Sequence, residues 1–404
     1  MKNNIKFIFI LSIFIGPYLS FGPLYIFHIV MVLMIGLILL EIIKDNKINM
    51  GYLNKWYMTL PLIGIPWMLF TGFWSGSILH TLTYLIYFTI GLLIIYSMNY
   101  QNSLKRDLLN YVKYIKKILW IILPISFMEI FMNFRLPFSA SEYTVWQSEP
   151  TVFWGNPNNF ATVLNLILPF ILFSKNKFKW LIGLVILVVI YYTNSRLNII
   201  AYLIIIALYF LYENKKKIVY FISIGAFSFC ILYTLIEKFR LMIKEVMTEF
   251  IGIIETIVEF VTMSNDLHVF DSSGVRQNLM LHGIEGLVNS NLLGVGAGAS
   301  PLLHIIWLGE EGAMHNFWLE ILVEQGVMFF IFFIIWYSYL IFKNYKLYRI
   351  NKTQPQNRIA GAISISLIGF IIGALSPSST IYMLPMWLMF SLALISIRVN
   401  TIKE

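Results

Sequence analysis

Apolar runs long enough to cross a lipid bilayer recur along the whole of this 404-residue chain. A transmembrane helix needs about 20 mostly apolar residues, and inside the bilayer its backbone hydrogen bonds must be made within the protein. Hydrophobic residues make up 59% of the chain and charged residues 12%, against about 25% charged in soluble domains. The sequence therefore predicts an all-α polytopic membrane protein. The twelve expected spans lie near residues 7–20, 24–43, 57–74, 78–97, 117–134, 158–174, 179–193, 197–212, 218–236, 315–342, 359–375 and 380–397.

The basic residues predict which side of the membrane each loop faces, because cytoplasmic loops are enriched in Lys and Arg. With the N-terminus inside, 23 of the 29 basic residues fall in inner loops or at the two termini. Both termini are then cytoplasmic, and one large extracytoplasmic loop separates the ninth and tenth spans. The chain divides into spans one to nine (1–236), this outer loop (237–313) and spans ten to twelve (314–404).

The few basic residues expected outside are mainly arginines. They include four of the eight arginines but only two of the 21 lysines. Lysine clusters flank residues 179–215 on both sides, so we expect a helical hairpin there with Arg196 at its outer tip. Arginine presents a planar fork of donors that suits phosphate or carboxylate. The outer arginines are therefore candidate anion-binding residues, and an arginine that merely extends to the interface is the alternative for Arg196.

The outer loop contains two predicted helices. Residues 237–261 form an amphipathic pattern, which predicts a helix that lies on the outer membrane surface or caps a cavity between spans. A second helix should begin near Ser272 or Ser273, with Arg276 in its first turn. A cation there opposes the helix dipole, so we expect Arg276 to hold a ligand anion together with free backbone N–H groups. Pairing with Asp271 is the alternative.

Polar residues also cluster where the sixth and tenth spans begin. Asn156 and Asn158, in GNPNN, predict a turn and an N-cap, and their amides can also bind sugar hydroxyls. His315 stands at the mouth of the tenth span, with Asn316 beside it and two glutamates one and two turns deeper, Glu320 and Glu324. Histidine suits proton transfer near neutral pH. Carboxylates inside a span are expensive to bury, so their presence indicates a functional role. Helix capping is the alternative role for His315.

The glycine-rich run GVGAGA, residues 294–299, is only superficially similar to a dinucleotide-binding fingerprint. No strand precedes it, and it lies on the outside. We expect its glycines to let the backbone approach a membrane surface or ligand closely. No pair of His or Cys residues has the spacing of metal ligands, so no metal site is predicted.

Four sequence motifs follow one another in a recognisable order. They are GNPNN (155–159), NSRLN (194–198), SSGVRQNLM…LLGVGAGAS (272–300) and HNFWLEILVEQG (315–326). With the twelve-span layout and a single large late outer loop, the chain resembles the O-antigen polymerase and ligase superfamily. This superfamily includes the capsule, exopolysaccharide and teichuronic acid polymerases of Gram-positive bacteria.

The resemblance implies glycan transfer on the outer face of a bacterial plasma membrane. The donor would be an oligosaccharide on undecaprenyl diphosphate. A polymerase passes it to another lipid-linked repeat unit, whereas a ligase passes it to a different acceptor. A flippase and a chain-length regulator of the same pathway are the expected protein partners, and neither a cofactor nor nucleic acid is expected. By the family pattern, Arg196, Arg276 and His315 would correspond to functional outer-face residues.

We therefore expect Arg196 and Arg276 to clamp the donor diphosphate, in place of a metal ion, while His315 or Glu320 takes the proton of the acceptor hydroxyl. A lipid-linked oligosaccharide transporter is the non-enzymatic alternative, but the sequence has no two-fold internal repeat with broken spans in matching halves. Polymerase is favoured over ligase because GNPNN is more similar to the Gram-positive polymerases. The wider predicted substrate-binding set adds Arg135, Asn156, Asn158, Asn316 and Glu324.

Overall fold

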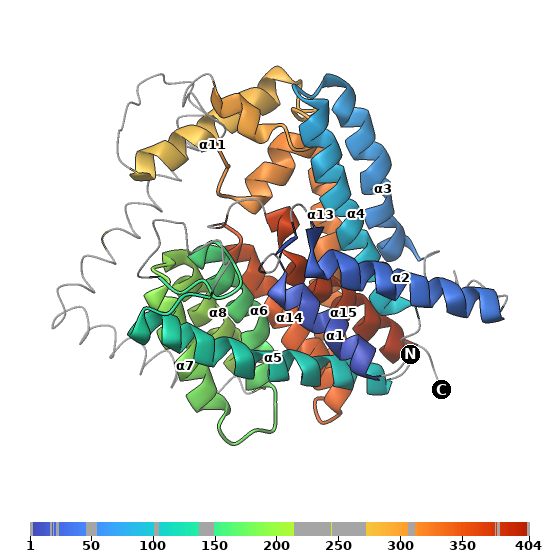
Figure 1. Cartoon of the computed structure of the whole chain (residues 1–404), viewed down its shortest axis with the longest axis vertical. Helices are drawn as coiled ribbons and strands as arrows, with labels where there is room; N and C mark the ends of the chain where they lie inside the picture. The colour runs from blue at the N-terminus through green and yellow to red at the C-terminus, as the bar shows by residue number, and fades with distance from the viewer. Residues whose placement is uncertain are drawn as a thin grey trace.

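The structure is a computed structural model that describes residues 3–16, 18, 20–21, 24–45, 55–100, 105–136, 149–213, 244, 272–305, 312–375, 377 and 380–401. Most of these residues are α-helical (Figure 1). The helices are α1 (Asn3–Ile15), α2 (Ile26–Asp45), α3 (Trp56–Thr71), α4 (Ile78–Asn99), α5 (Lys105–Met132), α6 (Pro157–Leu172), α7 (Lys179–Tyr192), α8 (Arg196–Glu213), α11 (Ser272–Asn289), α13 (Phe317–Ile350), α14 (Pro355–Gly373) and α15 (Leu384–Thr401). Three short 3₁₀ turns, η1 (Gly72–Trp74), η3 (Ser300–His304) and η4 (Thr380–Tyr382), and the antiparallel pair β1 (Ser20–Phe21) and β2 (Leu24–Tyr25) complete the described elements.

The predicted all-α fold is confirmed for the described residues, apart from the two-residue strands. Every expected span except the ninth overlaps a helix. The ninth span, 218–236, lies outside the described residues. So does the amphipathic helix expected at 237–261, except for Lys244. Five described helices are long and apolar enough to cross a membrane: α2, α4, α8, α13 and α14. The number of twelve spans, the division of the chain and its orientation stay predictions.

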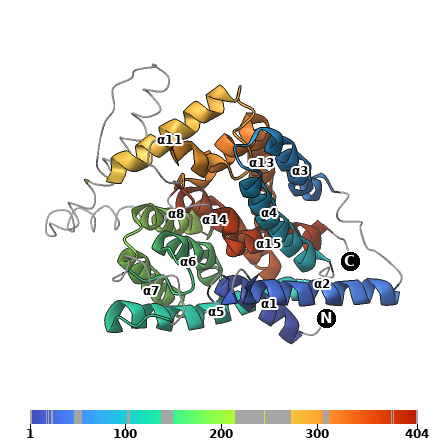
Figure 2. The ribbon, with the colours of Figure 1, turned by 45° about the horizontal axis from the view of Figure 1, so that its top comes forward.

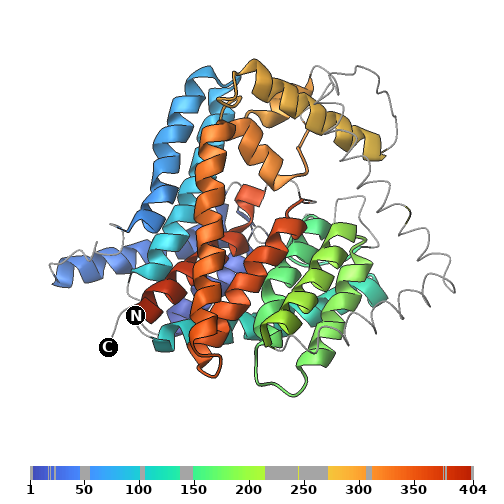
Figure 3. The same ribbon diagram turned by 180° about the vertical axis from the view of Figure 1, so that it is seen from behind.

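Helix α14 lies at the centre of the helical bundle, with α13, α6, α8 and α15 packed around it (Figures 1 and 3). Its most apolar window is 78% buried, against 22% for that of α2 at the edge. Small residues let the neighbours approach, because a Cβ at Gly361 would lie 2.7 Å from the Tyr348 ring and one at Gly369 2.5 Å from Ile205. Such close approach replaces the hydrophobic driving force that is missing between helices in lipid.

The predicted hairpin is present, with α7 and α8 joined by residues 193–195 and packed together on α6 (Figure 2). Arg196 is the first residue of α8, where the sequence placed it. The hydroxyl of Tyr202 in α8 donates to the carbonyl of Gly183 in α7 at 3.0 Å and so connects the two helices.

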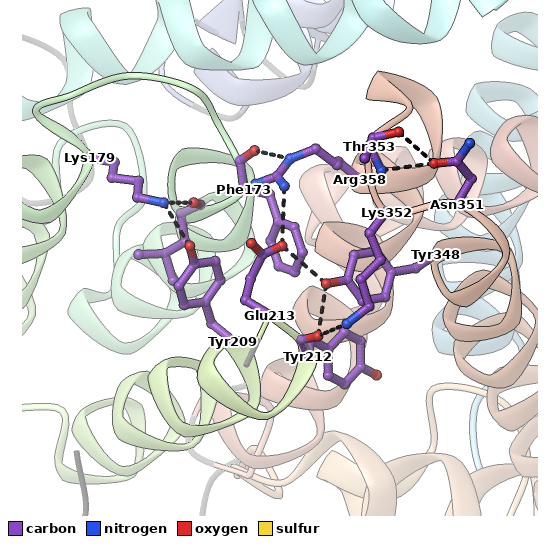
Figure 4. Close-up of polar contacts among 11 residues, drawn as sticks. Phe173, Lys179, Tyr209, Tyr212, Glu213, Tyr348, Asn351, Lys352, Thr353 and Arg358 are labelled. Atoms are coloured by element: carbon purple, nitrogen blue, oxygen red, sulfur yellow. Dashed lines mark hydrogen bonds and ion pairs between the residues drawn. The ribbon is translucent and has the colours of Figure 1, made fainter. Parts of the chain in front are cut away.

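Cations close the helix C-termini at one end of the bundle (Figure 4). Lys179 donates to the carbonyl of Leu172 at 3.1 Å, and the Nε of Arg358 donates to that of Phe173 at 3.0 Å. Lys352 donates to a carbonyl in the last turn of α8. The final carbonyls of a helix have no partner within the helix and carry partial negative charge, so these contacts stabilise α6 and α8. All three cations belong to loops that the charge distribution assigns to the cytoplasm.

A break at Gly326 divides α13 into a short segment, 317–325, and a long one. The backbone of Gly326 has φ 77° and ψ 171°, and these dihedral angles lie far outside the helical region. The glycine-rich run passes beside this break, where Gly296 donates to the carbonyl of Glu324 at 3.1 Å and Val327 donates to that of Leu292 at 3.0 Å. The backbone hydrogen bonds that α13 loses at the break are thus replaced from another segment.

The glycine-rich run lies against helices with no room for side chains. Gly294, Gly296 and Gly298 all have positive φ, and an added Cβ at each would meet an atom of α13, of Ser75 or of His80 at 2.3 to 2.7 Å. The close backbone approach expected from the sequence is therefore present. Its partner, however, is the protein itself and not a membrane surface or ligand.

Replacing Gly326 by alanine should lower the free energy of unfolding by at least about 2 kcal/mol, because a Cβ there is disfavoured by the positive φ and meets the Leu293 carbonyl at 2.4 Å. Gly36→Ala is the matched control, since an added Cβ in α2 meets nothing within 4 Å and should change stability by less than about 1 kcal/mol. Thermal unfolding in detergent measures both. Equal melting temperatures for the two variants would contradict the role of Gly326.

Candidate functional site

Three helix starts are gathered around the end of α14. The side chain of Asn156 accepts from the backbone N–H of Asn158 at 2.8 Å and caps α6. Asn316 caps α13 by accepting from two backbone N–H groups at 3.1 and 3.2 Å. The backbone N–H of Phe317 donates to the carbonyl of Ala374 at 3.0 Å, which joins α13 to the end of α14. The predicted N-cap of the sixth span is confirmed, whereas at the tenth span the cap is Asn316 and not His315.

A buried polar network holds the start of α8 in this group. Asn198 is fully buried, and its amide nitrogen donates to the Ser195 hydroxyl at 2.8 Å. Its side-chain oxygen lies 3.0 Å from the amide nitrogen of Asn165 and 3.2 Å from the hydroxyl of Thr162, both in α6. That hydroxyl also lies 3.1 Å from the carbonyl of Gly373 in α14. One asparagine therefore fixes α8 against α6, and Thr162 extends the network to α14.

The electrostatic consequence is a concentration of positive partial charge. Each helix start carries the positive end of the helix dipole, which favours a bound anion. The backbone N–H groups in the first turn of α13 are already paired with Ala374 and Asn316. Half-buried Arg196 adds a full charge as the first residue of α8. Of the terminal carbonyls of α14, which carry the opposite partial charge, that of Ala374 already accepts from Phe317 and that of Gly373 lies 3.1 Å from the Thr162 hydroxyl.

His315 precedes the N-cap of α13 with an unusual backbone conformation. Its φ is 51°, in the left-handed region that few residues other than glycine adopt. The capping of α13 is performed by Asn316, so helix capping does not account for His315. Backbone strain of this kind often persists at functional sites.

Two buried carboxylates occupy the short first segment of α13. Glu324 accepts from the Ser300 hydroxyl at 2.7 Å, and the Tyr84 hydroxyl and the N–H of Gly298 also face it as donors. The Tyr382 hydroxyl in η4 lies near both carboxylates. The sequence placed both carboxylates along one unbroken span. The break at Gly326 instead puts them on the segment that precedes the long helix.

Arg135 lies among partners within the protein. Its Nη1 donates to the carbonyl of Glu149 at 3.0 Å and lies 3.5 Å from the buried carboxylate of Glu129. That carboxylate also accepts from the backbone N–H groups of residues 151–152 at 2.9 Å. The side chain of Glu149 accepts from Asn194 at the tip of the α7–α8 hairpin at 2.7 Å. Arg135 thus connects α5 to the segment before α6 and to the hairpin.

Arg276 lies in α11, which begins at Ser272 as the sequence predicts. The pairing with Asp271 lies outside the described residues, as does the Arg276 side chain. The first turns of α11 lie over the side of the molecule where α8 is found, in the views of Figures 1, 2 and 3. The structure therefore brings Asn156, Arg196 and Asn316 into one group, and leaves the contribution of Arg276 a prediction.

Sequence reasoning missed the polar side chains that support this region. Thr162 and Asn165 interrupt an apolar helix, and such residues in a span commonly bond to a neighbouring helix, so a signal was present. Tyr84, Ser300 and Tyr382 are far from Glu324 in the chain and carry no local signal. Among the described residues, no three His, Cys, Asp or Glu side chains lie together as a metal site requires.

His304, the last residue of η3, is a buried histidine whose ring centroid lies 6.4 Å from that of His282 in α11. Its side chain is fully buried, and neither ring nitrogen has a hydrogen-bond partner among the described residues. Burial, and to a smaller degree the nearby His282, lower its pKa to about 4. His304 is therefore neutral at physiological pH and packs as an apolar ring beside the turn that carries Ser300.

Residues 181–334 match the model of the O-antigen ligase family. The match runs from α7 into α13 and contains Arg196, Arg276, His315 and both buried glutamates. Comparison of the chain with curated proteins finds no match. The apolar helices and this domain define a membrane protein with an O-antigen polymerase or ligase domain, and members of that family are glycosyltransferase-like enzymes. The predicted resemblance to the superfamily is confirmed.

Replacing Asn198 by leucine should lower the free energy of unfolding by about 2 to 4 kcal/mol, because it leaves Asn165, Thr162 and Ser195 without a shared partner in the interior. Asn110→Leu is the control, since the side chain of Asn110 makes no hydrogen bond to the described residues. Unfolding in detergent measures both, and a control as destabilised as Asn198→Leu would contradict the role of the network.

The low pKa of His304 predicts a stability that depends on pH. The unfolded chain takes up this proton near pH 6.5 and the folded protein only near pH 4. The stability is therefore fully present above pH 6.5 and falls as the pH drops toward 4, by at most about 3 kcal/mol. His304→Leu should flatten this part of the melting-temperature profile, whereas His282→Gln should keep most of it. An unchanged slope in His304→Leu would contradict the assignment.

Proposed function

We propose that the protein is a metal-independent glycosyltransferase that polymerises undecaprenyl-diphosphate-linked repeat units into a surface polysaccharide, on the outer face of a bacterial plasma membrane. The observation that carries this proposal is the convergence of three helix starts beside Arg196. The starts of α8 and α13 lie within the matched residues 181–334, and that of α6 precedes them. The arrangement offers positive charge at fixed positions, which is what a diphosphate donor requires.

The donor diphosphate would lie against these helix starts. Arg196 presents its guanidinium from a helix held by Asn198, and Arg276 would approach from the first turns of α11. Two arginines match the paired phosphates of the donor in charge and in hydrogen-bond geometry. Asn156, Asn158 and Asn316 stand at the same helix starts and would bind sugar hydroxyls with what remains of their hydrogen-bonding capacity.

In the proposed step, an acceptor hydroxyl oxygen attacks the anomeric carbon of the donor sugar. The bond between that carbon and the diphosphate oxygen breaks, and its electron pair leaves with the lipid diphosphate. The arginines stabilise the charge that develops there, and His315 or Glu320 takes the acceptor proton. The growing chain would be transferred from its lipid diphosphate to a second lipid-linked repeat unit. The product is again a lipid-linked chain and can serve as the donor in the next cycle.

The ligase reaction is the second candidate function, because the matching family model is described as O-antigen ligase. The same clamp and base would serve it, and only the acceptor would differ. Because both reactions would use the same residues, only an experiment that identifies the acceptor can distinguish the polymerase from the ligase.

The first experiment incubates the purified protein with the lipid-linked repeat unit of its host, in the presence of a chelator, and resolves the products by size. A ladder of longer lipid-linked chains is the expected result. Transfer only after a second acceptor is added would identify a ligase. The absence of any covalent product would favour transport, and a product that requires added metal would contradict the metal-independent step.

Arg196→Lys should reduce the turnover number about 100-fold, because lysine keeps the charge but loses the bidentate geometry. Arg349→Lys, the same exchange at the other end of the bundle, should retain full activity. Loss of turnover in His315→Ala but not in Glu320→Gln would identify the base as His315, and the opposite pattern would identify Glu320. Full activity of Arg196→Lys would exclude the proposed clamp.

A further inference from the structure

A cavity of about 170 Å³ opens at the end of the bundle opposite the candidate site. It lies between α5, the end of α6, the turn that follows and the start of α7. Its polar lining comes from Lys116, Ser174, Lys175 and Asn176, and its apolar lining includes Trp120, Leu123 and Ile182. Helix α6 separates it from the helix starts by its full length, about 24 Å at 1.5 Å per residue.

The two lysines of this cavity have no hydrogen-bond or ion-pair partner among the described residues. Three cations at the same end differ, since Lys179, Lys352 and Arg358 each donate to a helix carbonyl. Lys116 is also half-buried, which makes an unpaired ammonium group costly. The cavity therefore has the charge and donors to hold an anion that the protein does not itself supply.

The apolar lining indicates what carries that anion. Trp120 lies at the cavity with 64% of its surface exposed, on a helix that the sequence expects to cross the bilayer. Indole rings concentrate at the level of lipid headgroups, and basic pockets between helices on the cytoplasmic side bind anionic headgroups. A soluble phosphate compound would use the ammonium groups and leave the apolar lining without a function.

We propose that this cavity is a binding site for an anionic phospholipid of the cytoplasmic leaflet. The headgroup phosphate accepts from Lys116 and Lys175, and the Asn176 amide faces the same phosphate from the turn after α6. The first acyl-chain carbons lie along Trp120 and Leu123. Since α6 carries this site at one end and the candidate active site at the other, the lipid also fixes the position of α6 against α5 and α7. The proposal does not depend on the transfer activity.

The test measures the dissociation constants of phosphatidylglycerol and phosphatidylcholine for the full-length protein in detergent, by native mass spectrometry. The double variant Lys116→Gln, Lys175→Gln should weaken phosphatidylglycerol about 30-fold, because two lysines at about 1 kcal/mol each correspond to that factor. The control Lys113→Gln, Lys177→Gln removes two exposed charges from the same elements without touching the cavity, and should leave the affinity within about 2-fold.

Several outcomes would overturn the proposal. Equal loss in the control would mean general attraction of lipid to a basic face. Equal affinity for phosphatidylcholine, or full displacement of phosphatidylglycerol by millimolar inorganic phosphate, would show that no anionic lipid is selected. If the double variant does not fold, the single variant Lys175→Gln in the exposed turn serves instead, with an expected loss of about 5-fold. An unchanged affinity in that variant would overturn the proposal as well.

Discussion

The hydrogen bonds of Asn198 hold the first turn of α8 against α6, and Thr162 of α6 meets α14 at the Gly373 carbonyl. The geometry of the candidate site depends on these contacts. An amide that loses its partners in an apolar interior costs several kcal/mol, so the three helices keep one relative position. Arg196 begins the same turn and therefore approaches a ligand from a rigid support. Electrostatic stabilisation of a leaving diphosphate needs such fixed donors, because donors that must reorganise during the reaction contribute less.

The two ends of the bundle are positively charged for different reasons. At the candidate site the charge comes from helix starts and from arginine. At the other end it comes from cations that close the C-termini of α6 and α8 (Figure 4). Those cations donate hydrogen bonds to the last carbonyls of the helices. They therefore define the helix ends and do not form a free basic surface. Lys116 and Lys175 donate to no helix carbonyl that the structure describes, and the lipid site rests on them.

The glycine-rich run connects the carboxylates to the rest of the bundle. Its backbone bonds replace those that α13 loses at Gly326, and the same run leads into Ser300, which donates to Glu324. The short segment 317–325 is thereby held at both ends, by Ala374 at its start and by the glycine-rich run at its finish. A side chain on any of these glycines would push the glycine-rich run away from the segments that it contacts. Steric limits, and not contact with a ligand, therefore explain why these positions are glycine.

The sequence by itself determined the helices, the α7–α8 hairpin, the N-cap at Asn156 and the family resemblance. These follow from hydropathy, charge and capping chemistry, all of which act over a few residues. Only the tertiary structure determined the break at Gly326, the partners of Glu324 and the network of Asn198. These depend on which helix faces meet, and the bonds of Thr162 join residues 36 and 211 positions apart. Local patterns contain no information about such pairings, because a polar side chain in a span indicates that it needs a partner but not where that partner lies.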